Sequence, residues 1–161
     1  MTAPGTALGT GTPNYLVVVD DTDESALAMR YAAIRAKMTG GNIMLVNIVP
    51  KPEFLLSGGL QDMIAAEAQE AAEALLSRKA DEVMTLSGQR PALVIREGKA
   101  VDEVGRILTE NKVHALILGA AAKGAPGPLV SHFSGERAGN LPCVVVIVPG
   151  GLDPEAIDRL A

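Results

Sequence analysis

The chain has 161 residues and a formal charge of −5, a length that suits a single domain and a charge that argues against a nucleic-acid surface. Apolar residues make up 48% of it but aromatic residues only 2%, so that its core has to be built from Ala, Val, Leu, Ile and Met. The single cysteine, Cys143, excludes an internal disulfide and suits a cytoplasmic protein, and no apolar run approaches the roughly 20 residues of a membrane span.

Residues 1–13 are rich in Gly, Thr and Pro. They have neither a basic segment nor an apolar segment, so we expect a flexible arm and not a secretory signal. The folded domain is expected over residues 14–150. In residues 151–161, Asp153 suits an N-cap and Pro154 a first helical position, which predicts a short terminal helix.

Between these ends, apolar runs alternate with segments of helical periodicity. The predicted strands cover residues 15–20, 42–50, 92–98, 114–120 and 143–149. The predicted helices cover residues 23–39, ended by two glycines, then about 60–86, 100–111 and 131–140. Strands that alternate with helices indicate an α/β fold with a mostly parallel sheet, and their apolar runs indicate burial on both faces.

The predicted helix 60–86 carries apolar residues at helical spacing. These are Met63, Ile64, Ala71, Leu75, Ala80 and Val83. Because the segment is rich in alanine and has no sustained heptads, we interpret it as a helix packed on the sheet and not as a coiled coil. The preceding loop holds Phe54, Leu55 and Leu56, which could pack as a flap.

In such folds, ligands bind beyond the carboxyl ends of the strands, where the strand order reverses. The first strand ends there with Asp20, whose carboxylate could accept hydrogen bonds from ribose hydroxyls or from an adenine amine. Asp20 closes an apolar run, so we expect it to be buried, where a carboxylate needs a partner. Asp21, Thr22 and Asp23 are more simply explained as caps of the first helix.

The ordered segments resemble the universal stress protein (UspA-type) family from Asn14 to Pro149. The matching pieces are "LVVVDDTDES", "NIVP", "IREGKAVDEV" and the Pro142-Cys143 pair before the last strand. The resemblance implies a doubly wound, Rossmann-like, five-stranded parallel sheet of order 3-2-1-4-5 with helices on both faces. It also implies a small cytoplasmic homodimer, many of whose relatives bind ATP or AMP.

ATP-binding members carry G-x2-G-x9-G-[ST] after the fourth strand, where glycines let main-chain N–H groups approach phosphates. This chain departs from the pattern. Gly119 matches the first glycine and Ala122 replaces the second, while the final pair falls on Ser131 and His132, at the expected helix entry. The resemblance implies that Asp20 faces the nucleoside and that the main chain of Ile48 borders the adenine. Further candidate contacts are Thr22, Lys123, Gly124, Gly127 and Ser134.

The candidate residues form no Ser-His-Asp arrangement, no catalytic carboxylate pair and no metal-ligand cluster, so no catalytic residue is assigned. His132 could act as an acid or base or hold a phosphate, or it could be an exposed residue of the helix start. We expect His114 to be a surface residue and Cys143 a core residue.

Three hypotheses follow. The first is a dimeric stress-response sensor or regulator that binds ATP, with Mg²⁺, or AMP. The second is a dimeric interaction scaffold of the same fold whose degenerate pocket does not bind ATP. The third is an adenylyl- or phosphoryl-transfer enzyme.

The last strand predicts the dimer. By the family order it is an edge of the sheet, and a long apolar edge needs a cover. We therefore expect an isologous contact between two copies, with no nucleic acid or membrane as partner. Its residues are Val144, Val145, Val146, Ile147 and Val148.

Overall fold

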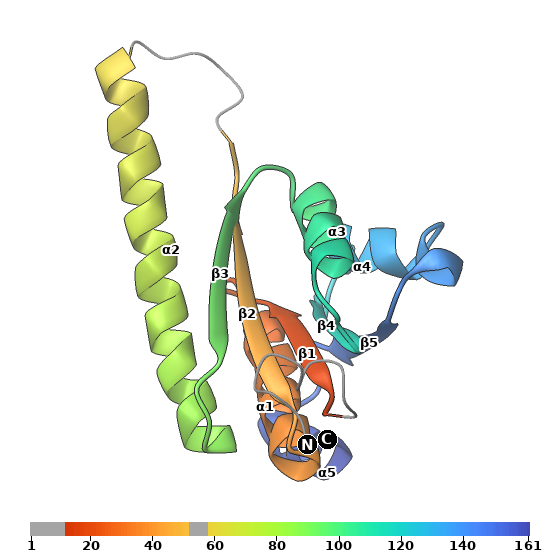
Figure 1. Ribbon diagram of the computed structural model, residues 1–161. Coiled ribbons are helices and arrows are strands. Elements are labelled where there is room, and N and C mark those ends of the chain that lie inside the picture. Colours follow the sequence, from red (N-terminus) through yellow and green to blue (C-terminus); the bar gives the residue numbers. More distant parts are fainter. Residues whose placement is uncertain (1–11, 52–57) are drawn as a thin grey trace.

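The computed structural model describes residues 12–51 and 58–161, and at its centre lies a five-stranded parallel sheet (Figure 1). The strands are β1 (Asn14–Val18), β2 (Asn42–Val49), β3 (Ala92–Glu97), β4 (Ala115–Ala120) and β5 (Val144–Pro149). Their order, β3-β2-β1-β4-β5, confirms the predicted topology, and the order reverses between β1 and β4. Most of the expected N-terminal arm and the expected flap of Phe54, Leu55 and Leu56 lie outside the described residues.

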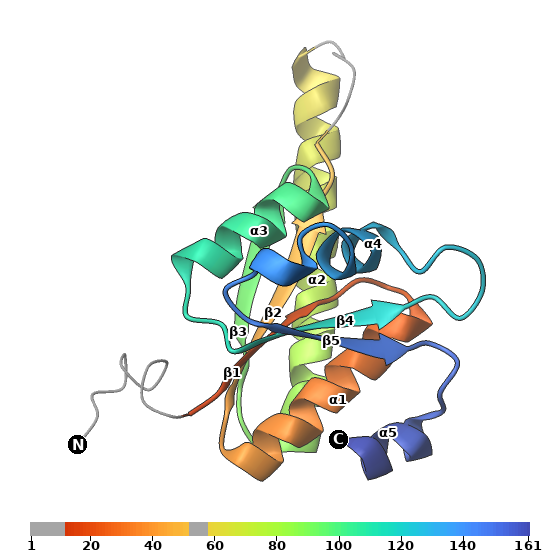
Figure 2. The same cartoon turned by 90° about the vertical axis from the view of Figure 1, so that its right-hand side faces the viewer.

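Helices cover both faces of the sheet (Figures 1 and 2). One face packs against α1 (Asp23–Thr39), α2 (Gly58–Ser87) and α5 (Pro154–Leu160). The other packs against α3 (Ala100–Glu110) and α4 (Pro128–Ser134). The central strands β1, β2 and β4 thus lie between two helical layers, which explains why most of their residues are apolar.

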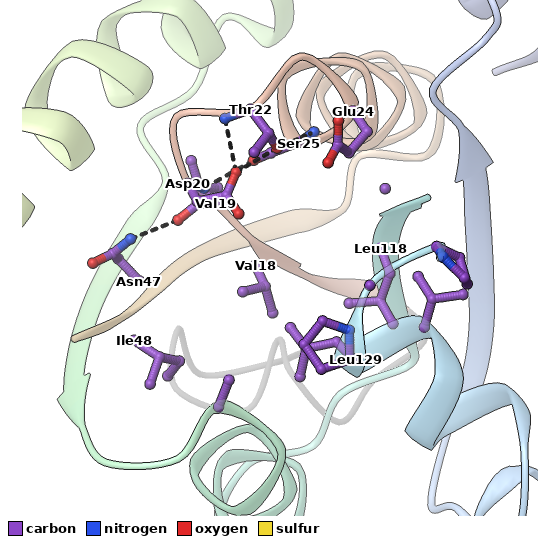
Figure 3. A pocket seen from close by; sticks show the side chains of 16 residues that line it. Val18, Val19, Asp20, Thr22, Glu24, Ser25, Asn47, Ile48, Leu118 and Leu129 are labelled. Atoms are coloured by element: carbon purple, nitrogen blue, oxygen red, sulfur yellow. Dashed lines mark hydrogen bonds between the residues drawn. The ribbon is translucent and has the colours of Figure 1, made fainter. Parts of the chain in front are cut away.

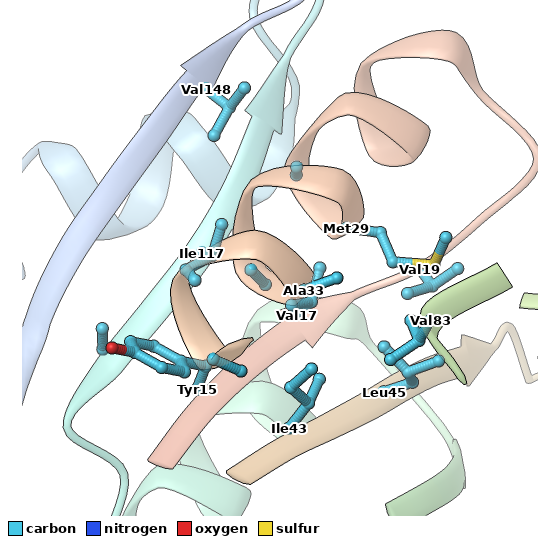
Figure 4. Packing of buried hydrophobic residues seen from close by; sticks show 14 of the residues in the cluster. Tyr15, Val17, Val19, Met29, Ala33, Ile43, Leu45, Val83, Ile117 and Val148 are labelled. Carbon is cyan, nitrogen blue, oxygen red and sulfur yellow. The ribbon is translucent and has the colours of Figure 1, made fainter. Parts of the chain in front are cut away.

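Alternation along the strands divides the core into two clusters. In β1, Tyr15 and Val17 face α1, while Leu16 and Val18 face α3 and α4. Pairing in register, from Asn14 with Asn42 to Val18 with Val46, carries this alternation into β2. Figure 4 shows the first cluster, in which alanines of α1 allow the helix to lie close to the sheet.

Helix α1 begins and ends as its sequence predicts. Thr22 is the N-cap, and its hydroxyl accepts a hydrogen bond from the N–H of Ser25 at 3.3 Å. Asp23 and Glu24 lie in the first turn, where negative charge stabilises the helix dipole. At the other end Gly40 adopts a left-handed conformation with φ 72°, which ends the helix.

Helix α2 differs from the prediction in its first half. Its buried residues, Ala72, Leu75, Leu76, Ala80 and Val83, all lie at or after the middle of the helix. Met63, Ile64 and Ala71, which we expected to face the sheet, are exposed. The cause is geometric, because the first half of α2 extends beyond the end of the sheet (Figures 1 and 2).

Helix α4 also differs from the prediction, because it begins at Pro128 and not near Ser131. Gly127, with φ 117° and ψ 154°, turns the chain, and Pro128 occupies the first turn, where its missing N–H costs nothing. The helix ends at Ser134, and only a short 3-10 turn, Ala138–Asn140, follows. The Gly-Pro pair was the sequence signal for the correct start.

Strand β5 is less buried than predicted. It pairs only with β4, so that one of its edges is open. Val144 is 64% exposed and Ile147 is 39% exposed, whereas Val148 is buried in the hydrophobic core.

Candidate functional site

A cavity of about 240 Å³ lies beyond the carboxyl ends of β1, β2 and β4, at the point where the strand order reverses (Figure 3). The first turn of α4 and Ala100 of α3 complete the wall of the cavity. In Figure 3, Asp20, Thr22 and Glu24 lie along one rim, and Ile48 and Leu129 lie opposite them. This is where a doubly wound sheet is expected to hold a ligand.

The floor of the cavity is apolar. Val18, Ile48 and Leu118 lie there because strand alternation directs all three toward the α3 and α4 face. Leu129 of α4 completes the apolar surface. Such a floor, with polar groups on one rim, suits a flat apolar ring that carries polar edges.

Asp20 lies at the rim and is exposed, contrary to the expected burial. Its Oδ1 accepts hydrogen bonds from the N–H of Thr22 at 2.9 Å and from the Thr22 hydroxyl at 2.5 Å. These bonds link the end of β1 to the cap of α1. Both bonds use Oδ1, so the other carboxylate oxygen, Oδ2, is left for a ligand.

Two polar residues that the sequence analysis missed support this rim. The buried Ser25 accepts a hydrogen bond at its hydroxyl from the N–H of Asp20 at 2.9 Å. Asn47 donates from its side-chain amide to the carbonyl of Val19 at 2.7 Å. Asn47 interrupts the apolar run of β2 near its carboxyl end, and that position was a signal that could have identified it.

The loop between β4 and α4 covers residues 121–127. Its N–H at Ala121 donates to the carbonyl of Pro126 at 3.1 Å, which closes the loop on itself. Gly124 and Gly127 have φ values of 75° and 117°, which a side chain would strain. Gly119, just before the loop, has another reason to be glycine, because a Cβ there would overlap the main-chain carbonyl of Glu24 in α1.

The predicted contact residues divide into two groups. Asp20, Thr22, Ile48, Gly119 and Gly127 line the cavity. The remaining six do not line it, and they are Ala122, Lys123, Gly124, Ser131, His132 and Ser134.

The earlier start of α4 explains why its polar residues lie away from the cavity. The N–H of Ser131 donates to the carbonyl of Gly127 at 3.0 Å, within the helix. The Ser134 hydroxyl donates to the carbonyl of Val130 at 2.6 Å. The ring of His132 packs edge-on against Phe133, with centroids 4.8 Å apart.

The two other candidate reactive residues, Cys143 and His114, do not line the cavity. Cys143 is half-buried, and burial raises the pKa of its thiol, which disfavours the reactive thiolate. His114 is exposed, and its Nδ1 accepts a hydrogen bond from the N–H of Asn14 at 2.9 Å.

Within residues 12–51 and 58–161, no group of three or more His, Cys, Asp or Glu side chains could hold a metal ion. Among the helices in those ranges, none is both long and apolar enough to cross a membrane.

The sheet order, the two helical layers and the cavity at the reversal define a doubly wound α/β protein with a cavity at the edge where this class of fold binds ligands. The model of the universal stress protein family matches residues 13–149. The chain belongs to this family. A search of the curated proteins finds no match.

Solved structures share the fold at low sequence identity. The universal stress protein UspA from Lactobacillus plantarum is 20% identical, with a TM-score of 0.69 over 87% of this chain and 99% of that one. A family protein from Arabidopsis thaliana with AMP bound is 13% identical, with a TM-score of 0.61 over 85% and 91% of the two chains. The universal stress protein from Archaeoglobus fulgidus in complex with dAMP is 16% identical, with a TM-score of 0.54 over 84% and 96%.

Proposed function

We propose that this protein is a dimeric, cytoplasmic regulator or sensor of the stress response that binds an adenine nucleotide, ATP or AMP, in the cavity at the reversal of strand order. The observation that carries the proposal is the position of Asp20, at the end of β1 and across the cavity from the apolar Ile48. The AMP and dAMP complexes of the structural relatives support the choice of an adenine nucleotide.

In this proposal the two sides of the cavity recognise two parts of the ligand. The adenine lies on the apolar floor beside the main chain of Ile48, between Val18 and Leu129. The ribose hydroxyls donate to the carboxylate of Asp20, which Thr22 holds in place. A purine ring gains from the apolar surface, and a hydroxyl gains from a charged acceptor.

The phosphates, in the same proposal, extend toward Gly119 and the loop of residues 121–127. Gly127 borders the cavity, and the predicted contacts at Ala122, Lys123 and Gly124 require the loop to close over the ligand. Ser131, His132 and Ser134 lie further along α4, so that we give them the smallest part in binding. If ATP binds, Mg²⁺ accompanies its phosphates.

Calorimetric titration with AMP and ATP tests the site. Asp20→Ala should weaken binding by about 1.5–3 kcal/mol, the range for a hydrogen bond to a charged group. Asp20→Asn should retain the acceptor for Thr22 and lose only the charge. Asp23→Ala is the control, since this exposed neighbour does not line the cavity. Unchanged affinity in Asp20→Ala would place the ligand elsewhere, and no binding of any adenine compound would favour the scaffold hypothesis.

The proposed dimer joins the open edges of two β5 strands. Val144 and Ile147 present exposed apolar side chains there, and Val145 and Val146 are half-buried. Val148 contributes only main-chain groups, because its side chain lies in the core. Covering this edge would remove an unpaired row of N–H and carbonyl groups.

Light scattering on a sizing column tests the dimer. Val144→Lys should give a monomer, because it places a charge on the proposed interface and leaves the core intact. Leu93→Lys is a matched control on the opposite edge strand, where Leu93 is 46% exposed. A dimer that survives Val144→Lys but dissociates with Leu93→Lys would assign the interface to β3.

A further inference from the structure

The charges that line the cavity have one sign. Among the described residues of its wall, the only ionisable side chains are Asp20 and Glu24, and both are acidic. Asp20 has a place in the proposed nucleotide site, as the partner of the ribose. Glu24 has none, although it lies in the first turn of α1 on the same rim (Figure 3).

Although Glu24 belongs to α1, it lies beside the start of the loop that follows β4. A Cβ built on Gly150 would be 3.1 Å from the Cβ of Glu24 and 3.2 Å from the main-chain nitrogen of Ala122. Glu24 and the amide of Ala122 therefore lie beside the same glycine. The main-chain carbonyl of Glu24 also lies against Gly119, where a Cβ would overlap it. Glu24 thus borders both the cavity and the start of the loop, on the path proposed for the phosphates.

No basic side chain offsets this carboxylate within the described part of the wall. Lys51 and Lys99 line an adjoining hollow on the far side of Ile48, which the cavity and this hollow share. Arg78 of α2 lines a second adjoining hollow. Lys123 is exposed on the loop and does not line the cavity.

The consequence for a ligand depends on its number of phosphates. Two like charges repel each other more strongly in a partly enclosed site than in bulk water, and each added phosphate adds negative charge. We propose that Glu24 is a specificity-determining residue that restricts this cavity to adenine nucleosides and monophosphates and disfavours triphosphates. This inference rests on the proposed adenine site.

The test compares four ligands, adenosine, AMP, ADP and ATP, by calorimetry on the full chain at low salt with EDTA. In the wild type we expect affinity for ATP below that for AMP. In Glu24→Gln, the ratio of the ATP dissociation constant to the adenosine dissociation constant should fall about tenfold, which corresponds to about 1.4 kcal/mol. Asp23→Asn is the matched control, since it removes one charge from the same turn without changing the cavity wall. It should leave the ratio within twofold of the wild type.

Salt gives an independent measurement. The wild-type discrimination against ATP should shrink between about 0.05 and 0.5 M NaCl, because salt screens charge repulsion, and it should change little in Glu24→Gln. Equal ratios in the wild type and Glu24→Gln would overturn the inference while leaving the adenine site intact. A preference for ATP that appears with Mg²⁺ and disappears in Glu24→Gln would also overturn it, by making Glu24 a metal partner. No binding of adenosine or AMP by either protein would instead refute the proposed function itself.

Discussion

The longest and the shortest α-helices on one face of the sheet pack in opposite ways. Helix α5 has seven residues and is held at both ends. Asp153 caps it by accepting from the N–H of Ala156 at 2.8 Å, Ile157 is buried against α1, and Asp158 pairs with Arg30. Helix α2 has 30 residues, and none of residues 59–71 is buried. Length in sequence therefore does not measure how firmly a helix is held.

The difference between α5 and α2 shows that apolar spacing in the sequence predicts a helix but not its burial. Apolar residues at helical spacing specify a helix and one apolar face, and both halves of α2 have them. Burial also requires a surface for that face to pack against, and the first half of α2 extends past the end of the sheet (Figure 1). Leu60, Met63 and Ile64 consequently remain exposed, whereas Leu75 and Leu76 are buried.

Proline substitutions should separate the two halves of α2 most strongly. Ala80→Pro should cost about 3 kcal/mol or more of the free energy of unfolding, because it breaks a packed helix. Ala66→Pro should cost less than about 1 kcal/mol, since the turns before it can unfold without exposing the core and are marginally stable alone. Urea denaturation measures both values. Equal losses would mean that the first half of α2 is held as firmly as the second.

Truncations to alanine should give the next largest contrast. Leu76→Ala removes a side chain that is 1% exposed and should cost about 2–4 kcal/mol. Met63→Ala, at 59% exposure, should change stability by no more than about 0.5 kcal/mol. Thermal melting of the two variants checks the difference. A large loss in Met63→Ala would show that another surface covers this half of α2 in solution.

The cap of α5 should contribute a smaller, measurable amount. Asp153→Ala should cost about 1 kcal/mol, because the N–H of Ala156 loses its acceptor. Asp153→Asn keeps an oxygen in place and should retain most of the stability. If both variants melt like the wild type, α5 is held by Ile157 alone.

The exposed pair between Arg30 and Asp158 should have the smallest effect. Arg30 donates from Nε and Nη2 to the two carboxylate oxygens at 2.6 and 2.8 Å, and these bonds lower the pKa of Asp158. The stabilisation is therefore present above the ordinary aspartate pKa of about 3.9 and is lost as the pH falls through the lower native pKa. Asp158→Asn should melt slightly below the wild type at pH 7, and the two curves should converge at acid pH. A difference that is independent of pH would exclude the ion pair as its cause.

Much of the fold could be predicted because it depends on local patterns and on one topological rule. Continuous apolar runs gave the central strands, and Thr22, Gly40 and Asp153 marked helix ends through their own chemistry. Parallel strands with helical connections then place all carboxyl ends on one edge. The resemblance to a known family supplied the strand order, which the structure confirms.

The candidate site could be predicted only in part, because its two sides have different origins. Asp20, Thr22, Ile48 and Gly119 follow directly from the ends of strands, and they line the cavity. The loop and α4 depend on where the helix begins, and a start three residues earlier than expected moves Ser131 and His132 away from the cavity.

By itself the sequence determined which segments are strands and helices, where most of them end, and which residues stand at the carboxyl edge of the sheet. Only the tertiary structure decided which of those residues share a cavity, that Asp20 is exposed, that Glu24 borders the glycine loop and that Leu60, Met63 and Ile64 of α2 are exposed. The reason is physical. Secondary structure follows from neighbours along the chain, whereas exposure and proximity follow from where distant segments end in space.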